Sequence, residues 1–415
     1  MNINLILMII FGTIAFISPF WGLALMVALI PIEGMFALMQ TFTFIKFLGI
    51  VTFISFIIRC SIGKESIKAD KFIVISATLV IWGLITTLWA RYPNFGYMKS
   101  ITLAQLILFS FMILSMVNSW TRFISIIIAF IGGALLASFK TIIFYLTGLA
   151  ERASALATQN PNNMGRILAI ALILVIFLMI EQKKFKFMYY IISIPMFIAL
   201  IMTGSRGSWI AFAGGLIIVF LFTFKKFSLG VNILIVMLIF GLTLIFGLKK
   251  GLIRPYIAKR AEQVIEAKNI STAIGSRWII YQVALEMIKD NFLLGVGLGN
   301  FPWRYKDYVN KVKGAYVVGY FKDAHNSFIC IFAETGIFGF LLFVFLFLFL
   351  IWKLINNPQL FKKNIFTLLF SLLAVIFISS VSGTNFGKKY FWFVISLVDS
   401  VILSKLYFPR WEEKS

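Results

Sequence analysis

The sequence predicts an all-α polytopic membrane protein with about twelve transmembrane helices. Of its 415 residues, 61% are hydrophobic and only 13% are charged, and the mean hydropathy is +0.99. A soluble globular protein is nearer half apolar and a quarter charged. The apolar residues also form long runs that are separated by polar connections, which is typical of a chain that crosses a bilayer repeatedly.

The predicted helices follow from the positions of these runs, because a transmembrane helix needs about 20 apolar residues, or fewer where it is short or broken. The runs are 43–58, 72–89, 101–117, 123–146, 167–180, 187–202, 209–224, 231–248, 326–352, 365–382 and 390–407. Pro19 divides the first thirty residues into two pieces that are each too short to cross comfortably. We expect them to cross once as a broken helix, and a tight hairpin is the alternative.

The orientation follows from Lys and Arg in the short connections, which are enriched on the cytoplasmic side. Connections such as 59–71, 183–186 and 405–414 are rich in these residues, and the alternate set is poorer. The C-terminus is therefore predicted to be cytoplasmic. The chain is expected to divide into N-terminal transmembrane helices (1–248), a periplasmic loop with amphipathic helices (249–325) and C-terminal transmembrane helices (326–415).

The formal net charge is +23, yet the basic residues cluster beside apolar runs. This pattern fits topology signals and contact with membrane lipids, so nucleic acid is not an expected partner. Cys60 and Cys330 are predicted to lie at opposite sides of the membrane, which excludes a disulfide framework. The single histidine and the lack of closely spaced carboxylates on the predicted outer face indicate no metal site, and no cofactor is expected.

Two outer segments, 203–209 and 274–278, resemble each other because each places Gly-Ser-Arg at the start of a predicted helix. A helix N-terminus offers unpaired N–H groups, and arginine adds a bidentate donor. Arg206 and Arg277 are therefore candidates for binding the two phosphates of a diphosphate. The alternative is that Ser205 and Ser276 only cap the helices, while the arginines contact lipid headgroups.

His325 is the only histidine, and it lies where the long polar loop meets the apolar run 326–352. Imidazole is the side chain whose unperturbed pKa lies near neutrality, so His325 is a candidate general base. The alternative is an interfacial histidine that hydrogen-bonds nearby backbone. Asp323 is close enough in sequence to orient the ring. Glu334 would point to the opposite side of an unbroken helix, which favours a structural role.

Other residues of the predicted outer face are candidates for substrate contact or for structural support. Residues 276–291 form a predicted amphipathic helix, which ends in the glycines of 295–299 and would lie on the outer leaflet or cover a cavity. The Asn-Pro-Asn-Asn segment 160–163 is placed to cap the helix that follows it. The candidates of this second group are Arg152, Asn162, Ser205, Ser276, Asp323 and Asn326.

These sequence elements, taken in their order along the chain, resemble the O-antigen ligase and O-antigen polymerase family of bacterial membrane glycosyltransferases. The resemblance rests on Asn-Pro-Asn, on Gly-Ser-Arg-Gly between two spans, and on a long outer loop with a second arginine. It ends with His-Asn followed by Glu-x-Gly-x-x-Gly, in which His325, Glu334, Gly336 and Gly339 stand. The shared motifs cover about 152–339 and do not separate ligases from polymerases.

The resemblance implies a GT-C-like helical fold in the inner membrane and a glycan donor carried on undecaprenyl diphosphate. It implies that His325 activates the acceptor hydroxyl, while Arg206 and Arg277 bind the diphosphate without a metal. The leading hypothesis is an O-antigen ligase that transfers glycan to a lipid A–core sugar with inversion. A polymerase that joins lipid-linked repeat units is the alternative. A lipid-linked glycan flippase, motivated by charges near spans such as Lys140 and Asp399, belongs to another class.

Overall fold

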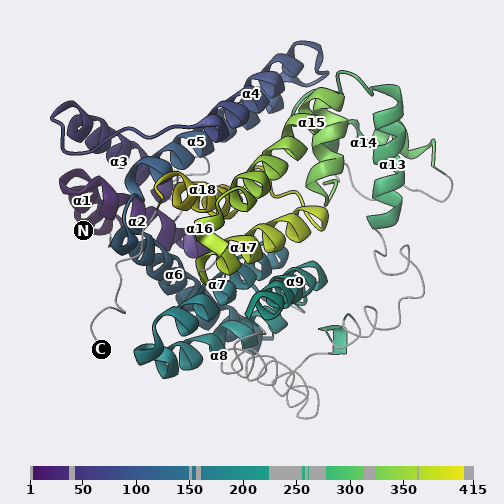
Figure 1. Ribbon diagram of the computed structural model, residues 1–415. Helices are drawn as coiled ribbons and strands as arrows, with labels where there is room; N and C mark the ends of the chain where they lie inside the picture. Colours follow the sequence, from purple (N-terminus) through teal and green to yellow (C-terminus); the bar gives the residue numbers. More distant parts are fainter. Residues whose placement is uncertain are drawn as a thin grey trace.

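The computed structural model describes residues 3–36, 43–148, 152–155, 160–223, 255–257, 260, 277–312, 323–361 and 364–405. The elements of these parts are helices, which gather into a bundle with α13 and α14 beside one end (Figure 1). The N-terminal helices are α1 Ile3–Ile17, α2 Pro19–Leu29, η1 Ile30–Phe36, α3 Phe44–Ser61, α4 Lys71–Ile85, η2 Thr86–Trp89, α5 Pro93–Met116 and α6 Trp120–Leu146. The rest are α7 Pro161–Glu181, η3 Lys183–Phe185, α8 Lys186–Met202, α9 Arg206–Thr223, α13 Arg277–Asp290, α14 Phe301–Val309, α15 Ser327–Ile355, α16 Pro358–Phe361, α17 Asn364–Val381 and α18 Lys389–Leu403.

Nine helices in the described residues are long and apolar enough to cross a membrane, which confirms a polytopic membrane protein. They are α3, α4 with η2, α5, α6, α7, η3 with α8, α9, α15 and α17. The predicted run 390–407 corresponds to α18, which at 15 residues is shorter than these nine. The predicted run 231–248 lies outside the described residues.

The first two helices form a hairpin, which is the alternative to the expected single crossing. Ser18 is extended between them, and Pro19 starts α2. A Cβ atom on Gly22 would lie 2.8 Å from that of Ala15, so the two helices touch just beyond the turn. Along α3, Ser55 donates to the carbonyl of Phe16 at 2.7 Å, whereas Met26 of α2 packs farther back, against Gly49. The two helices therefore run in opposite directions along α3.

Hydrogen bonds between connections show which helix ends lie together at what we term the inner end, after the predicted cytoplasmic side. Glu65, after α3, pairs with Arg122 at the start of α6 at 2.6 Å. Lys353 near the end of α15 pairs with Asp70, which precedes α4, and with Asp399 of α18. The starts of α5, α7, α9 and α15 therefore lie at the opposite end, here termed the outer end.

Helix α7 is the centre of the bundle, since 89% of its span is buried, compared with 39% for the neighbouring spans of α8 and α9. Its sequence is apolar on all sides, as expected for a helix surrounded by protein. Asn160 caps it by accepting a hydrogen bond from the backbone N–H of Asn162 at 2.9 Å, which confirms the predicted cap. The packing of α7 thus fixes the positions of Asn162, Asn163 and Arg166 at the outer end.

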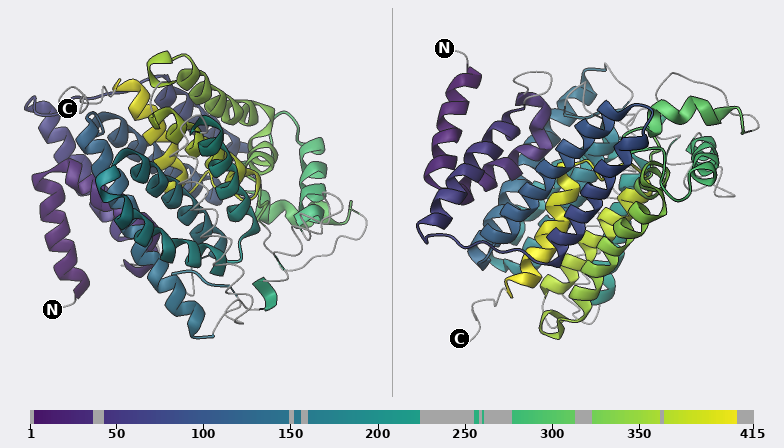
Figure 2. Two further views of the ribbon diagram at one scale, coloured as in Figure 1. Left: turned by 60° about the horizontal axis from the view of Figure 1, so that its bottom comes forward. Right: turned by 90° about the horizontal axis from the view of Figure 1, so that it is seen from above.

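The predicted amphipathic helix is α13, and its predicted apolar face is the buried one. Ile280, Val283, Ala284, Met287 and Ile288 are buried in a cluster with residues of α14 and α15. The apolar face of α13 therefore packs against α14 and α15. Figure 2 shows α13 and α14 projecting at the end of the bundle away from the C-terminus.

Helix α15 is broken at Gly336, whose φ is 65°, so the unbroken helix assumed from the sequence is wrong. The loop after α13 fills the break: the carbonyl of Glu334 accepts from the backbone N–H of Gly297 at 2.8 Å. The Glu334 carboxylate is buried and pairs with Lys99 of α5 at 2.6 Å. These contacts tie three segments together, which is a structural role for Glu334.

Candidate active site

Residues 381–385, the last residue of α17 and the first part of its connection to α18, lie at the centre of the candidate site and are here called the central turn. The carbonyl oxygen of Ser382 accepts from Nη2 of Arg166 at 2.9 Å and from Nη1 of Arg277 at 2.8 Å. A Cβ atom on Gly383 would lie 1.7 Å from Arg166 Nη2, so only glycine leaves room for this guanidinium. The central turn thus joins Arg277, which starts α13, with Arg166, which lies near the start of α7.

The segment that bears His325 is attached to the same turn. The hydroxyl of Ser327 donates to the carbonyl of Gly383 and accepts from the backbone N–H of Asn385, both at 2.8 Å. The hydroxyl of Thr384 donates to the carboxylate of Asp323. The central turn therefore contacts both Arg277 and the segment that bears His325.

His325 has a left-handed backbone conformation with φ 51°, which is uncommon for a residue with a side chain. The conformation is supported on both sides of the residue. Asn326 caps α15 by accepting from the backbone N–H groups of Phe328 at 2.9 Å and Ile329 at 3.1 Å. The carbonyl of His325 accepts from the hydroxyl of Tyr281 at 3.3 Å. Such strain is typical of functional sites, where the surrounding structure enforces it.

Asn326 is a helix cap in the structure, and Asp323 holds the central turn through Thr384. Orientation of the His325 ring by Asp323 stays a prediction. Ser205 lies next to the start of α9, where its hydroxyl is 2.8 Å from that of Ser208. Ser276 lies outside the described residues.

Five arginines, here called the outer arginine cluster, gather around the starts of α7, α9 and α13. Arg152 donates from Nε to the carbonyl of Thr203 at 2.9 Å and from Nη2 to the amide oxygen of Asn162 at 2.6 Å. Arg260 donates from Nε to the carbonyl of Gly204 at 2.8 Å. The five residues are Arg152, Arg166, Arg206, Arg260 and Arg277.

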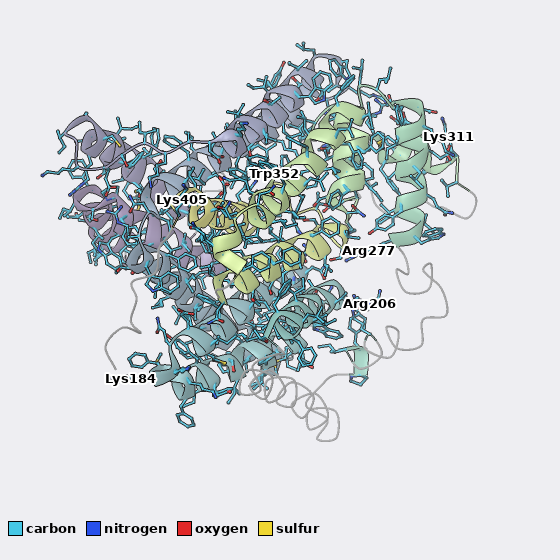
Figure 3. The ribbon with its side chains drawn as sticks, viewed as in Figure 1. Lys184, Arg206, Arg277, Lys311, Trp352 and Lys405 are labelled. Carbon is cyan, nitrogen blue, oxygen red and sulfur yellow. The ribbon has the colours of Figure 1, made fainter. Side chains whose placement is uncertain are left out.

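Arg206 is the first residue of α9, and the start of this helix packs on the central turn. A Cβ atom on Gly207 would lie 2.3 Å from the hydroxyl oxygen of Ser382, which shows how close the two backbones are. Figure 3 shows Arg206 and Arg277 at one side of the molecule, with Lys184 and Lys405 of the inner end at the other. The two arginines singled out in the sequence are thus brought to the same end.

Burial and like charge act together on this cluster. The pKa of Arg152 is lowered to about 10, mainly by burial and to a smaller extent by the positive charges of Arg260, Arg277 and Arg206. Burial also lowers the pKa of Arg277, with a smaller contribution from Arg166, Arg260 and Arg206. Both shifts show that the charged forms are disfavoured here. An anion would relieve this repulsion, so the cluster is suited to bind one.

Arg166, Arg260 and the central turn were not among the candidate residues from the sequence. Arg166 lies one turn after the Asn-Pro-Asn-Asn segment, at the edge of the apolar run 167–180, and this position was the only signal in the sequence. Its contact with Ser382 joins positions 216 apart in the chain, which no local pattern indicates. Within the described residues, no group of three or more His, Cys, Asp or Glu side chains could hold a metal ion.

Comparison with known proteins supports the interpretation of this geometry. Residues 191–344, just over a third of the chain, match a family model described as O-antigen ligase. This part of the chain is similar to an O-antigen ligase domain. An uncharacterized protein of Haemophilus influenzae (strain ATCC 51907 / DSM 11121 / KW20 / Rd) is 28% identical over 185 residues, which cover 43% of this chain and 45% of that protein. This chain thus aligns with less than half the length of that relative.

The O-antigen ligase match includes the start of α9, helix α13 and the first half of α15. Arg206, Arg277 and His325 therefore lie inside it. Arg166 and the central turn lie outside the matched residues, although the carbonyl of Ser382 accepts hydrogen bonds from both Arg166 and Arg277. The match thus covers three of the residues that the sequence singled out, but not the turn that one of them contacts.

Proposed function

We propose that this protein is an O-antigen ligase, which transfers a glycan from undecaprenyl diphosphate to a sugar hydroxyl of lipid A–core. The observation that carries the proposal is the central turn. It connects the outer arginine cluster with the segment that holds the only histidine. A cationic site for a leaving diphosphate and a base for the incoming hydroxyl are the two groups that this transfer requires.

In the proposed reaction, the acceptor hydroxyl attacks the anomeric carbon of the donor sugar. His325 accepts the proton of that hydroxyl as the new C–O bond forms. The bond between the anomeric carbon and the phosphate oxygen breaks, and its electron pair leaves on the diphosphate. Arg206 and Arg277 bind the departing anion. One direct displacement inverts the configuration at the anomeric carbon.

The proposed roles of the remaining residues follow from their contacts. Arg152 and Arg260 hold the carbonyls of Thr203 and Gly204, so they shape the turn before α9. Arg166 and Ser327 hold the central turn from two sides. Fixed donors stabilise developing charge without reorganisation at the moment of reaction, so rigid support of this kind favours catalysis.

We further propose that the site faces the periplasm, in the bacterial inner membrane, with the C-terminus in the cytoplasm. The distribution of Lys and Arg between the two ends of the bundle supports this orientation. The regions 1–248 and 326–415 would then be transmembrane, with 249–325 periplasmic. Labelling of the single variants Lys184→Cys and Lys311→Cys tests the orientation. Only Lys311→Cys should react with an impermeant thiol reagent in intact spheroplasts.

The test of function is reconstitution with defined substrates. Purified protein in lipid nanodiscs should join lipid-linked glycan to lipid A–core and release undecaprenyl diphosphate. His325→Ala should lower the transfer rate by about 10²–10⁴-fold, because general base catalysis is worth that amount, while donor affinity is retained. EDTA should leave the rate unchanged.

Three outcomes would contradict the proposal in different ways. Chain elongation from donor alone, without transfer to lipid A–core, would make the protein a polymerase. Movement of lipid-linked glycan across liposomes without covalent change would make it a flippase. Full transfer activity of His325→Ala would remove the histidine from the mechanism. Against transport, the described contacts of Asp399 include an ion pair with Lys353, and Lys140 lies exposed on α6.

A further inference from the structure

Two adjoining hollows border the connection between α17 and α18. The first is a lateral groove of about 360 Å³ between α3 and α5, with α2 as its floor. The second is a polar pocket of about 420 Å³ at the outer end, lined by Lys99, Asp323, Glu334 and Thr384 among others.

The groove and the pocket form one path along α5. Thr102 lines both of them. The connection between α17 and α18 also borders both, since Thr384 lines the pocket while Gly387 and Lys389 line the groove. A molecule can therefore lie in the groove and reach Asp323, which is two residues before His325.

The polarity of this path changes with depth. Lys46, Thr102, Gln105 and Lys389 line it near the outer end. Deeper in, the walls are apolar: Phe53 and Ile54 of α3, and Leu108, Phe109 and Met112 of α5. The order matches a lipid whose head lies toward the outer end and whose chains point toward the inner end.

The length of the groove suits an acyl chain. From Thr102 to Met112, which lies four residues before the end of α5 at Met116, the helix rises roughly 15 Å at 1.5 Å per residue, about half of a 30 Å hydrocarbon core. The acyl chains of a glycerol- or glucosamine-based lipid fit this length. A polyprenyl chain is much longer and would extend beyond the groove.

The charges at the mouth of the groove favour an anionic head. Lys46 and Lys389 both line it, and Glu33 pairs with Lys389. These three groups leave an excess of positive charge, which is complementary to a phosphorylated headgroup. The pocket beyond it offers the Lys99–Glu334 pair, the Asp323 carboxylate and a hydroxyl, which are suitable partners for sugar hydroxyls.

We infer that the groove and the pocket bind the acceptor, a phosphorylated glycolipid whose acyl chains lie between α3 and α5 and whose sugar reaches the pocket beside Asp323. This inference rests on the proposed function. The donor diphosphate and the acceptor lipid then approach His325 from opposite sides of the central turn.

Tryptophan substitutions on the two walls of the groove test the inference. Ile54 is 49% exposed and Leu108 is 45% exposed, so a larger ring at either position enters the groove without overpacking the core. Ile128 of α6 is also 49% exposed and lies outside the groove, so Ile128→Trp is the matched control. Initial rates would be measured in nanodiscs with lipid-linked glycan and lipid A–core, each varied in turn.

Both Ile54→Trp and Leu108→Trp should raise the acceptor KM on the order of ten-fold, the effect of losing roughly two buried methylene groups. Both should leave the donor KM within about two-fold, and Ile128→Trp should leave both constants unchanged. Lys46→Glu should raise the KM for the phosphorylated acceptor more than for a dephosphorylated one, whereas Lys140→Glu on the exposed outer part of α6 should not.

The possible results separate the inference from the proposed function. Failure of the unsubstituted protein to join donor and acceptor would overturn the proposed function. Transfer by that protein, with an unchanged acceptor KM in both groove variants, would overturn the inference alone. A raised donor KM in these variants would assign the groove to the polyprenyl chain instead. Cross-linking from a photoreactive phenylalanine at Phe53 to radiolabelled acceptor, but not to donor, provides a readout independent of rate.

Discussion

The two ends of the bundle use positively charged side chains in different ways. At the inner end, Arg122 pairs with the carboxylate of Glu65, and Lys353 pairs with those of Asp70 and Asp399. At the outer end, the hydrogen bonds described for Arg152, Arg166, Arg260 and Arg277 go to backbone carbonyls, asparagine side chains and tyrosine hydroxyls. The contrast is between these inner pairs and the outer arginine cluster, since Lys99 and Lys389 at the outer end also pair with carboxylates.

The difference separates charges that hold the fold from charges that are available to a ligand. A carboxylate neutralises its cationic partner, and a buried pair of this kind is costly to break. A carbonyl or amide oxygen fixes the geometry of a guanidinium but leaves its full charge in place. The outer arginine cluster is therefore arranged in advance for an anion, while the inner pairs connect helices.

The largest effect is expected from removing the two arginines at the starts of α9 and α13. Arg206→Ala together with Arg277→Ala should lower the transfer rate by on the order of 10³-fold or more, because loss of one fixed charge-stabilising donor costs about 10²–10³-fold. Single-turnover rates and donor affinity measure this effect. Arg122→Ala is the control, and its folded fraction should keep its rate. Unchanged donor affinity in the double variant would show that these arginines do not bind the diphosphate.

Loss of an inner charge should affect stability instead. Lys353→Met leaves the buried carboxylate of Asp399 without the ammonium group that faces it, which should cost about 3–5 kcal/mol of stability. The melting temperature in detergent and the activity per folded molecule measure the two parts of this prediction. Lys184→Met, at an exposed inner position, should change neither. A large fall in the turnover of the folded Lys353→Met protein would break the distinction between the two ends.

A smaller effect is expected at the joint between the two halves of the candidate site. Ser327 is fully buried, and its hydroxyl joins the central turn at Gly383 and Asn385. Ser327→Ala should lower kcat about ten-fold, since loss of such a bond costs about 1–3 kcal/mol and displaces the segment that bears His325. The donor KM should stay within about two-fold, because the arginines keep their own contacts with Ser382. An altered donor KM at constant kcat would place Ser327 in donor binding.

Much of the fold could be predicted because bilayer thickness and the apolar character of a span are local properties of the sequence. The apolar runs 43–58, 123–146 and 365–382 correspond to α3, α6 and α17 within a few residues. Side-chain periodicity likewise gave the buried face of α13. The hairpin of α1 and α2 and the break at Gly336 depend instead on what packs beside them. Gly22 meets Ala15, and Gly336 meets the backbone of Leu293.

The residues of the candidate site likewise divide into those with a local signal in the sequence and those whose role depends on packing. Arg206 and Arg277 follow Gly-Ser at predicted helix starts, and His325 is unique in its type, so each carries its own signal. Arg166 looks like one more charge at the edge of a span, and residues 381–385 look like an ordinary loop. Their importance comes from contacts between residues far apart in the chain, such as Arg277 with Ser382. Such contacts arise from the packing of α7, α13 and α17, which no local pattern records.

The smallest effect is expected for Tyr281, which links α13 with both the histidine segment and the central turn. Its hydroxyl lies 3.3 Å from the carbonyl of His325 and 3.4 Å from that of Val381, so both hydrogen bonds are long. Tyr281→Phe should therefore lower kcat only about two- to three-fold, or roughly 0.5 kcal/mol. Tyr308→Phe, on α14, is the control and should leave kcat unchanged. Because burial raises the pKa of the Tyr281 phenol, it stays protonated above the pH at which an exposed tyrosine ionises. The difference between Tyr281→Phe and the unsubstituted protein should thus persist in rate profiles up to pH about 10, the ordinary tyrosine pKa. A difference that disappears well below that pH would mean that another group provides the link between α13 and the base.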